Sequence, residues 1–321
     1  MTHRDVSATG IGVRLRVGLS LFQDGPRRNV ELRRPYSRRR QGGPGHTIGR
    51  SCRHVSHALG FTRDSVPQER GRSILLRKPH ARGSIARLHY LVDERRHVGL
   101  LAGIDGGGKS LLLEVFDRQV RRAGTQVVHL SLLGIDSHEM LWCVAADLGA
   151  NPDRDATDFQ LSRTIVDCLA ANRLHDAQTV FLLDDADEAD PVTLDALVRL
   201  MDAERTTDSC TTFIVAVAQG QIRRLPPRML AQVELRVSLD HWEESDTANY
   251  LFNSLRQAGR HDAPFSADAV RKLHALCGGV PRRITQLANL ALLAGAGRNV
   301  QRIDADMVES AWSELGLAEA A

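Results

Sequence analysis

Short apolar runs alternate with stretches of helical spacing along residues 84–239. The apolar runs predict five β-strands, at 97–102, 125–130, 179–183, 211–217 and 233–237. Apolar residues at helical spacing predict helices at 84–96, 108–122, 136–149, 158–173 and 191–204. Strands that alternate with helices pair in parallel, and the helices cover both faces of the resulting sheet. This part of the chain is therefore predicted to be α/β, with a parallel sheet.

The pattern changes after residue 240, where no further strand is predicted. Apolar residues at helical spacing continue in four stretches, at 243–258, 266–276, 281–294 and 303–315. We therefore expect an α/β domain over 73–239 and a small all-helical domain over 240–321.

The first 72 residues differ from the rest in charge and composition. They hold 15 Arg and 5 acidic residues, whereas the remaining chain has a net charge of −7 and the whole chain of +3. Arg, Gly, Pro and Ser dominate, so too little apolar surface is available to offset the entropy of ordering. Residues 1–72 are predicted to be a disordered basic tail. The alternative is a flexible arm that binds nucleic acid or an acidic partner.

Composition excludes several classes of protein. At 42% hydrophobic residues the chain of 321 can bury a core. No run approaches 18 apolar residues and no secretory signal is visible, so no transmembrane segment is expected. The five cysteines are widely spread and the 13 histidines lack metal-binding spacings, which argues against a disulfide framework or a zinc enzyme. A reducing, cytoplasmic location fits this pattern.

The segment Gly103-Ile104-Asp105-Gly106-Gly107-Gly108-Lys109-Ser110 matches the phosphate-loop pattern G-x-x-x-x-G-K-[ST]. Glycines let successive N–H groups turn toward phosphates, and the following helix presents its positive N-terminal end. Lys109 is expected to contact the β and γ phosphates, and the Ser110 hydroxyl to bind Mg²⁺. A predicted buried strand precedes the loop and a helix follows it, as this chemistry requires.

A second candidate element is the apolar strand that ends in Asp184-Asp185. Ligands of parallel sheets bind at the carboxyl edge of the strands, so these carboxylates are expected beside the phosphate loop. We expect Asp184 to hold Mg²⁺ through water and Asp185 to polarise the attacking water. The alternative is that both aspartates merely open a polar loop.

Several segments together resemble AAA+ ATPases, and in particular the general secretion pathway protein A family of bacterial ATPases. The segments that carry the resemblance are Pro79–Val92, the Asp184-Asp185-Ala186-Asp187 run, Ala218-Gln219, Glu243–Gly259 and Gly278–Ile284. The resemblance covers roughly residues 75–315 and implies a phosphate-loop NTPase core followed by a helical lid. It also implies that Gln219 acts as a sensor at the end of its strand and that Arg282 belongs to a sensor-2 motif.

Local chemistry agrees with that assignment of Arg282. Gly278-Gly279 suits a helix end that needs a left-handed residue, and Pro281 suits the first turn of the next helix. Arg282 would then lie at the start of that helix, where a guanidinium can approach the γ-phosphate and stabilise transition-state charge. The alternative is a surface arginine in a helical hairpin.

The sequence departs from the family at two positions that bear on catalysis. Asp185 replaces the usual glutamate, and a carboxylate one methylene shorter misplaces the water by about an ångström, which costs on the order of 10²-fold in rate. The usual Gln-Arg pair before the last strand reads Ala231-Gln232. The candidates for an arginine finger acting on a neighbouring subunit are then Arg228, which we favour, Arg224 and Arg223.

The function we predict is an ATPase that binds ATP and Mg²⁺ and works as a conformational switch in a homo-oligomer. A role in secretion or assembly machinery follows from the resemblance. One alternative is a DNA-associated ATPase of the transposition or replication type, which the basic tail favours. Another is a nucleoside monophosphate kinase, because Gly-Ile-Asp-Gly-x-Gly-Lys-Ser also resembles the thymidylate kinase loop.

Overall fold

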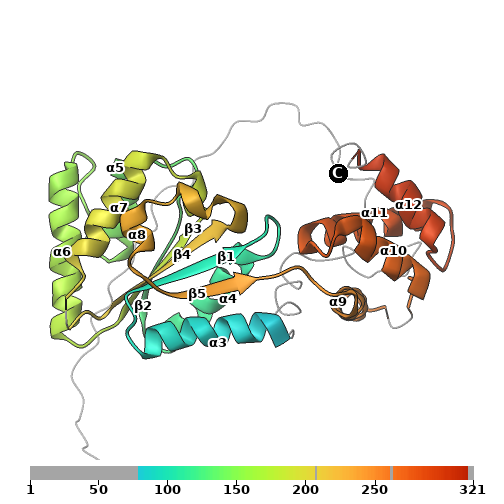
Figure 1. Cartoon of the computed structure of the whole chain (residues 1–321), viewed down its shortest axis with the longest axis horizontal. Coiled ribbons are helices and arrows are strands. Elements are labelled where there is room, and N and C mark those ends of the chain that lie inside the picture. Colours follow the sequence, from blue (N-terminus) through green and yellow to red (C-terminus); the bar gives the residue numbers. More distant parts are fainter. Residues whose placement is uncertain (1–78, 207, 261–262, 317–321) are drawn as a thin grey trace, which may run out of the picture. The chain divides into compact units, whose positions relative to one another are not determined.

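The computed structural model describes residues 79–206, 208–260 and 263–316. The predicted basic tail, 1–72, lies outside these residues. Among the described residues, five strands form one sheet in the order β2-β3-β4-β1-β5, and all neighbouring strands are parallel (Figure 1). The prediction of a parallel α/β sheet is therefore confirmed.

The strands coincide with the predicted apolar runs. They are β1 (Val98–Gly103), β2 (Gln126–Ser131), β3 (Thr179–Asp184), β4 (Thr211–Ala218) and β5 (Val233–Leu239). Every residue of β1, β3 and β4 is buried. The continuous apolar runs therefore reflect burial of both sheet faces, whereas the edge strand β5 alternates between exposed and half-buried residues over its first half.

Helices cover the two faces of the sheet. One face packs against α3 (Pro79–Asp93) and α4 (Lys109–Arg122). The other packs against α5 (Ser137–Asp147), α6 (Asp158–Leu174) and α7 (Pro191–Ala203). Each predicted helix of this region is present within a few residues of its expected ends.

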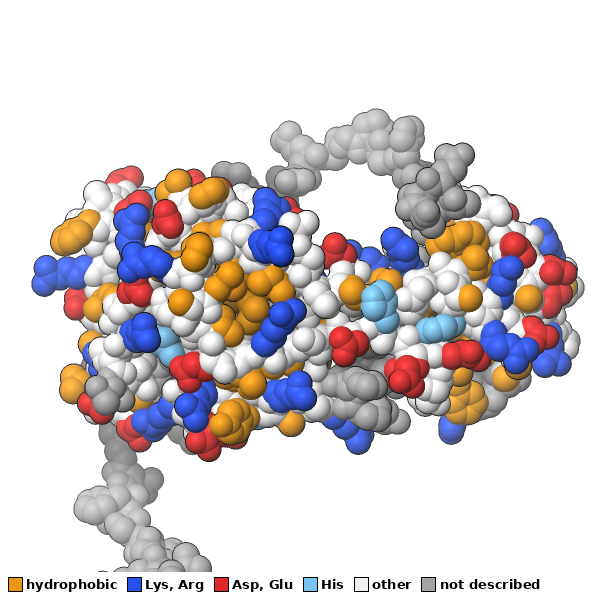
Figure 2. Space-filling model, in the orientation of Figure 1, with side chains coloured by type: hydrophobic (Ala, Val, Ile, Leu, Met, Phe, Trp, Pro, Cys, Tyr) orange, Lys and Arg blue, Asp and Glu red, His pale blue; other side chains and the backbone are white. Residues whose placement is uncertain are grey.

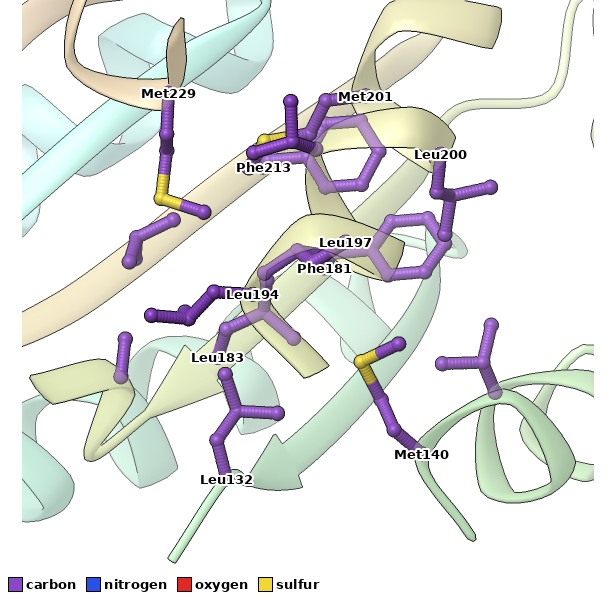
Figure 3. Packing of buried hydrophobic residues seen from close by; sticks show 14 of the residues in the cluster. Leu132, Met140, Phe181, Leu183, Leu194, Leu197, Leu200, Met201, Phe213 and Met229 are labelled. Atoms are coloured by element: carbon purple, nitrogen blue, oxygen red, sulfur yellow. The ribbon is translucent and has the colours of Figure 1, made fainter. Parts of the chain in front are cut away.

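Figure 3 shows the larger apolar cluster, between the sheet and α5 to α7. Phe181 of β3 and Phe213 of β4 are direct neighbours in the parallel register, so their side chains lie on the same face. Their rings stack with centroids 4.6 Å apart, and both side chains are fully buried. Burying each ring stabilises the fold by about 2–3 kcal/mol, which helps hold β3 and β4 together.

The C-terminal helices are α9 (Glu244–Gln257), α10 (Ala267–Cys277), α11 (Pro281–Gly297) and α12 (Ala305–Glu314). They enclose an apolar cluster of their own, which includes Leu273, Ile284 and Ala311. The domain boundary at residue 240 stays a prediction.

Three short helices in the connections between strands and helices were not predicted. These are η1 (Ala186–Glu188), η2 (Gln219–Arg224) and α8 (Pro227–Leu230). They are too short to produce a helical period in the sequence. Within the described ranges, no helix has both the length and the apolar character needed to cross a membrane.

Candidate functional site: the phosphate loop and the carboxyl edge of the sheet

The predicted phosphate loop connects the end of β1 to the start of α4. Gly106 and Gly108 have φ values of +73° and +100°, a left-handed backbone that residues with a Cβ rarely adopt. A Cβ on Gly107 would lie 2.9 Å from the carbonyl oxygen of Ile104. The loop therefore has the sharply turned backbone that a cradle for phosphates requires.

The N-terminus of α4 is open to an anion. Its N-cap is Gly108, which has no side chain to bond the first N–H groups, and its first turn has no acidic residue. Exposed helix N–H groups and the helix dipole both favour a negative charge at this end. Ser110, in the first turn, is exposed, so its hydroxyl is available to a ligand.

Lys109 is held inside the loop. Its side chain is 9% exposed, and Nζ donates to the carbonyl oxygens of Gly103 at 3.2 Å and Ile104 at 3.3 Å. A buried ammonium is unfavourable unless it is hydrogen-bonded. Loop carbonyls supply these bonds, and they keep the positive charge where a phosphate would bind.

The strand order brings the predicted site residues to one edge. β4 lies between β1 and β3, and Gly103 of β1 pairs with Ala218 of β4. Asp184 ends β3 in register with Ser131 of β2. Because carboxyl ends of parallel strands meet at one edge, the phosphate loop, Gln219 and Asp184-Asp185 share that edge.

Asp184 is buried, and its Oδ1 accepts the Asp185 N–H at 3.0 Å. Asp185 itself has a left-handed backbone, with φ 52° and ψ 40°, a conformation that Asp and Asn tolerate better than most residues. Its Oδ2 accepts a hydrogen bond from the Ser131 hydroxyl at 3.1 Å. The orientation of the Asp185 side chain is therefore set by its left-handed backbone and by the hydrogen bond from Ser131 of β2.

The pKa of Asp185 depends on its burial and on the charged and polar groups around it. Burial raises the pKa of the Asp185 carboxyl above its ordinary value of 3.8, and the Asp184 charge adds to the shift. The Ser131 hydrogen bond and the Lys109 charge act in the opposite direction, while Asp187 raises the pKa further. A raised pKa makes this carboxylate a better proton acceptor near neutral pH.

Two residues of this edge were missed by sequence reasoning. Ser131 follows the apolar run of β2, so the rule that drew attention to Asp184 at the end of β3 would have found it. Asp187 is buried, and its Oδ1 accepts the Ala218 N–H at 3.1 Å. It therefore fixes the end of β4, directly before Gln219, whose side chain is exposed.

Arg282 meets the phosphate loop through its backbone. Its N–H donates to the carbonyl oxygen of Gly106 at 3.2 Å. A Cβ built on Gly106 would lie 2.8 Å from Arg282 Cβ, so the absence of a side chain there permits the contact. The Arg282 side chain is exposed. The structure thus brings the predicted sensor-2 arginine to the loop that holds Lys109.

Arg228 does not join this cluster. It lies on α8 with its side chain 77% exposed, and it pairs with Asp202 at 2.7 Å. Asp202 is near the end of α7, which runs back from the carboxyl end of β3 toward the amino end of β4, so Arg228 points away from the phosphate loop. A finger that serves another subunit need not lie in its own site, and this assignment stays a prediction.

The residues present fit Mg²⁺ bound together with phosphates. Mg²⁺ keeps several waters and takes only one or two protein carboxylates in nucleotide sites. The buried carboxylate of Asp184 and the exposed hydroxyl of Ser110 meet this need. In the part of the chain that the structure describes, no three His, Cys, Asp or Glu side chains are arranged to hold a metal by themselves, and a site of this kind does not require them.

Comparison with known proteins agrees with this geometry. Residues 92–225 match the AAA domain family. The general secretion pathway protein A of Aeromonas hydrophila is 26% identical over 242 residues, which cover 74% of this chain and 44% of that protein. The chain therefore spans less than half of the length of this relative.

Solved structures share the fold at low sequence identity. Cdc6p from Pyrobaculum aerophilum has a TM-score of 0.61 at 16% identity, covering 81% of this chain and 70% of that one. The Aeropyrum pernix ORC1 protein, solved in complex with DNA, has a TM-score of 0.54 at 19% identity, covering 76% of this chain and 69% of that one. The Thermotoga maritima RuvB Holliday junction branch migration motor has a TM-score of 0.52 at 14% identity, covering 79% of this chain and 71% of that one. The chain therefore has the AAA+ fold of phosphate-loop NTPases, and residues 92–225 match the AAA domain family.

Proposed function

We propose that this protein binds ATP at the loop Gly103–Ser110 and hydrolyses it to ADP and phosphate. The observation that carries the proposal is the buried Lys109 ammonium inside a glycine loop, at the sheet edge where β3 ends in Asp184. Nucleotide binding by AAA domains and their relatives supports the same assignment.

Each residue of the edge has a role in this reaction. The N–H groups of Gly106, Gly107 and Gly108 and the Lys109 ammonium bind the phosphates. Asp185 orients a water for attack on the γ-phosphorus and accepts its proton, while the bond to the ADP oxygen breaks. Gln219, anchored through Asp187, bonds the attacking water or the γ-phosphate.

Ser110 and, through water, Asp184 would hold Mg²⁺, which would supply positive charge to the phosphates. Asp184 is suited to this position because its carboxylate is buried and already bonded to the Asp185 N–H. Asp185 remains one methylene shorter than the glutamate common in related sites, so we expect slow turnover rather than loss of binding.

The test is ATP binding by Lys109→Ala, measured by titration with a fluorescent ATP analogue. We expect affinity to fall about a hundredfold, because a buried charge-assisted contact to the phosphates is lost. Lys272→Ala is the matched control: Lys272 pairs with Glu309 on the C-terminal helices at 3.0 Å and should leave affinity unchanged. Equal ATP affinity of the parent and Lys109→Ala would show that ATP does not bind at this loop.

We also propose that the switch acts within a homo-oligomer, with Arg228 reaching a neighbouring subunit, and on a protein partner of a secretion or assembly system. The likeness to general secretion pathway protein A supports the partner class. The test is the ATPase rate per protein molecule at increasing protein concentration. We expect this rate to rise for the parent and to stay constant for Arg228→Ala.

A DNA-associated ATPase is the second candidate, because the net charge of +10 over residues 1–72 suits a polyanion. On the face drawn in Figure 2, basic and acidic side chains are interspersed rather than gathered by sign. Stimulation of the ATPase by duplex DNA at low salt, lost when residues 1–72 are removed, would favour this candidate. Phosphoryl transfer to dTMP in place of phosphate release would favour the kinase.

A further inference from the structure

Asp105 places a negative charge in a loop that is built to bind anions. Its Oδ1 lies 3.7 Å from Lys109 Nζ, with the Asp105 side chain 87% exposed and the Lys109 side chain 9% exposed. The pair therefore joins the buried ammonium to the solvent-facing rim of the loop.

The Lys109 ammonium already has partners before any phosphate arrives. It donates to the carbonyl oxygens of Gly103 and Ile104, and the Asp105 carboxylate supplies the only opposite charge that pairs with it among the described residues. Phosphates must therefore compete with Asp105 for Lys109, and they meet a carboxylate of their own sign at the rim.

A second cation lies beside the same part of the loop. Arg282 donates its N–H to Gly106, the residue after Asp105, and a Cβ built on Gly106 would lie 3.5 Å from Arg282 Cδ. Its side chain thus runs over the loop. Over the described ranges, no hydrogen bond or ion pair engages its guanidinium, so this charge is available to a phosphate bound at the loop.

We infer that Asp105 is an internal competitor for the nucleotide phosphates, which weakens the affinity of this loop for a nucleoside triphosphate more than for a diphosphate. The inference rests on the proposed function. The asymmetry follows because the triphosphate carries the additional γ-phosphate charge, at the position where the loop lysine binds. Asp105 acts through Lys109 and is a positioning residue, not a catalytic one.

The test compares ATP and ADP affinities of Asp105→Asn, using fluorescent analogues of both nucleotides. We expect ATP to bind about tenfold more tightly and ADP about threefold more tightly than to the parent. Asp105→Glu keeps the charge and should stay within about twofold of the parent for both nucleotides. Asp155→Asn, which neutralises an exposed carboxylate elsewhere on the α/β region, should change neither affinity.

A second measurement is the rise in melting temperature on adding ATP, which should be larger for Asp105→Asn than for the parent at the same ATP concentration. Unchanged or weaker ATP binding by Asp105→Asn would overturn the inference, and so would equal gains for ATP and ADP or an equal gain in Asp155→Asn. Failure of the proposed function is distinct, because the parent would then bind ATP no better than Lys109→Ala.

Discussion

At the level of single residues, the position from which Asp185 is proposed to act on water comes at the expense of stability. It is held in a left-handed backbone beside the buried Asp184, and burial together with the Asp184 charge raises its pKa. A carboxylate whose pKa is raised by folding is destabilising wherever it is ionised. Functional sites often retain such groups because their position serves the reaction.

Asp185→Asn should therefore increase stability while abolishing ATP turnover. Asn tolerates the left-handed backbone and its side-chain oxygen still accepts the Ser131 hydrogen bond, but the charge beside Asp184 is gone. The sign follows from the raised pKa: well below pH 3.8 the carboxyl is protonated in both the folded and the unfolded chain, so the Asp185 charge no longer separates parent from variant. As pH rises through the folded-state pKa, the parent loses stability and the variant does not.

Melting temperatures of both proteins between pH 4 and pH 8, without nucleotide, check this expectation. Asp155→Asn, which neutralises an exposed carboxylate in the loop before α6, serves as the control. A lower melting temperature for Asp185→Asn than for the parent at pH 8 would contradict the account of Asp185.

At the level of elements, the turn between α10 and α11 is anchored by its backbone. Gly279 accepts the Trp242 N–H at 2.9 Å through its carbonyl oxygen, and Gly278 accepts a hydrogen bond from His241 Nδ1 at 2.7 Å. The turn that begins the Arg282 helix is therefore bound to the connection between β5 and α9. Both glycines have left-handed φ values, +58° and +71°, but only one of them is crowded.

Gly279→Ala should destabilise the protein by about 3 kcal/mol, and Gly278→Ala by about 1 kcal/mol. A Cβ at Gly279 would lie 2.4 Å from the Trp242 carbonyl oxygen, a backbone atom that cannot turn aside, whereas a Cβ at Gly278 would meet nothing within 4 Å. Urea denaturation of the two variants measures the difference. Equal losses would mean that backbone conformation alone, without the Trp242 contact, determines the effect.

At the level of the whole molecule, the phosphate loop and the C-terminal helices are joined by the hydrogen bond from the Arg282 N–H to the Gly106 carbonyl oxygen. A ligand shifts a conformational equilibrium only as far as it binds the two states differently. A hydrogen bond from the Arg282 guanidinium to the γ-phosphate would make the two states bind ATP differently. ADP has no γ-phosphate and cannot form this bond.

Arg282→Ala should lower the ATP turnover number about tenfold or more while ADP affinity changes less than about threefold. The backbone bond to Gly106 survives the substitution, so the turn itself should remain in place. Steady-state phosphate release measures the turnover number, and titration with ADP measures the ADP affinity. Arg283→Ala, an exposed arginine one position along, is the control and should leave turnover near the parental value; equal losses in both variants would refute a special role for Arg282.

The sequence by itself determined the elements and the residue types of the site. Burial of both sheet faces leaves continuous apolar runs, and the glycine loop and the carboxylates at the end of β3 follow from chemistry within a few neighbouring residues. The strands, the long helices and the phosphate loop could therefore be predicted, whereas η1, η2 and α8 are too short to leave a period.

Only the tertiary structure decided which of these groups meet. Ser131 bonds Asp185 because β2 and β3 are neighbours in register, although 54 residues separate them. Gln219 lies between the loop and Asp184 because β4 inserts between β1 and β3. The Asp105–Lys109 pair depends on how the loop folds back, and the Arg282–Gly106 bond on how the last turn docks. Strand order and docking arise from packing across the whole core, which no local pattern of residues records.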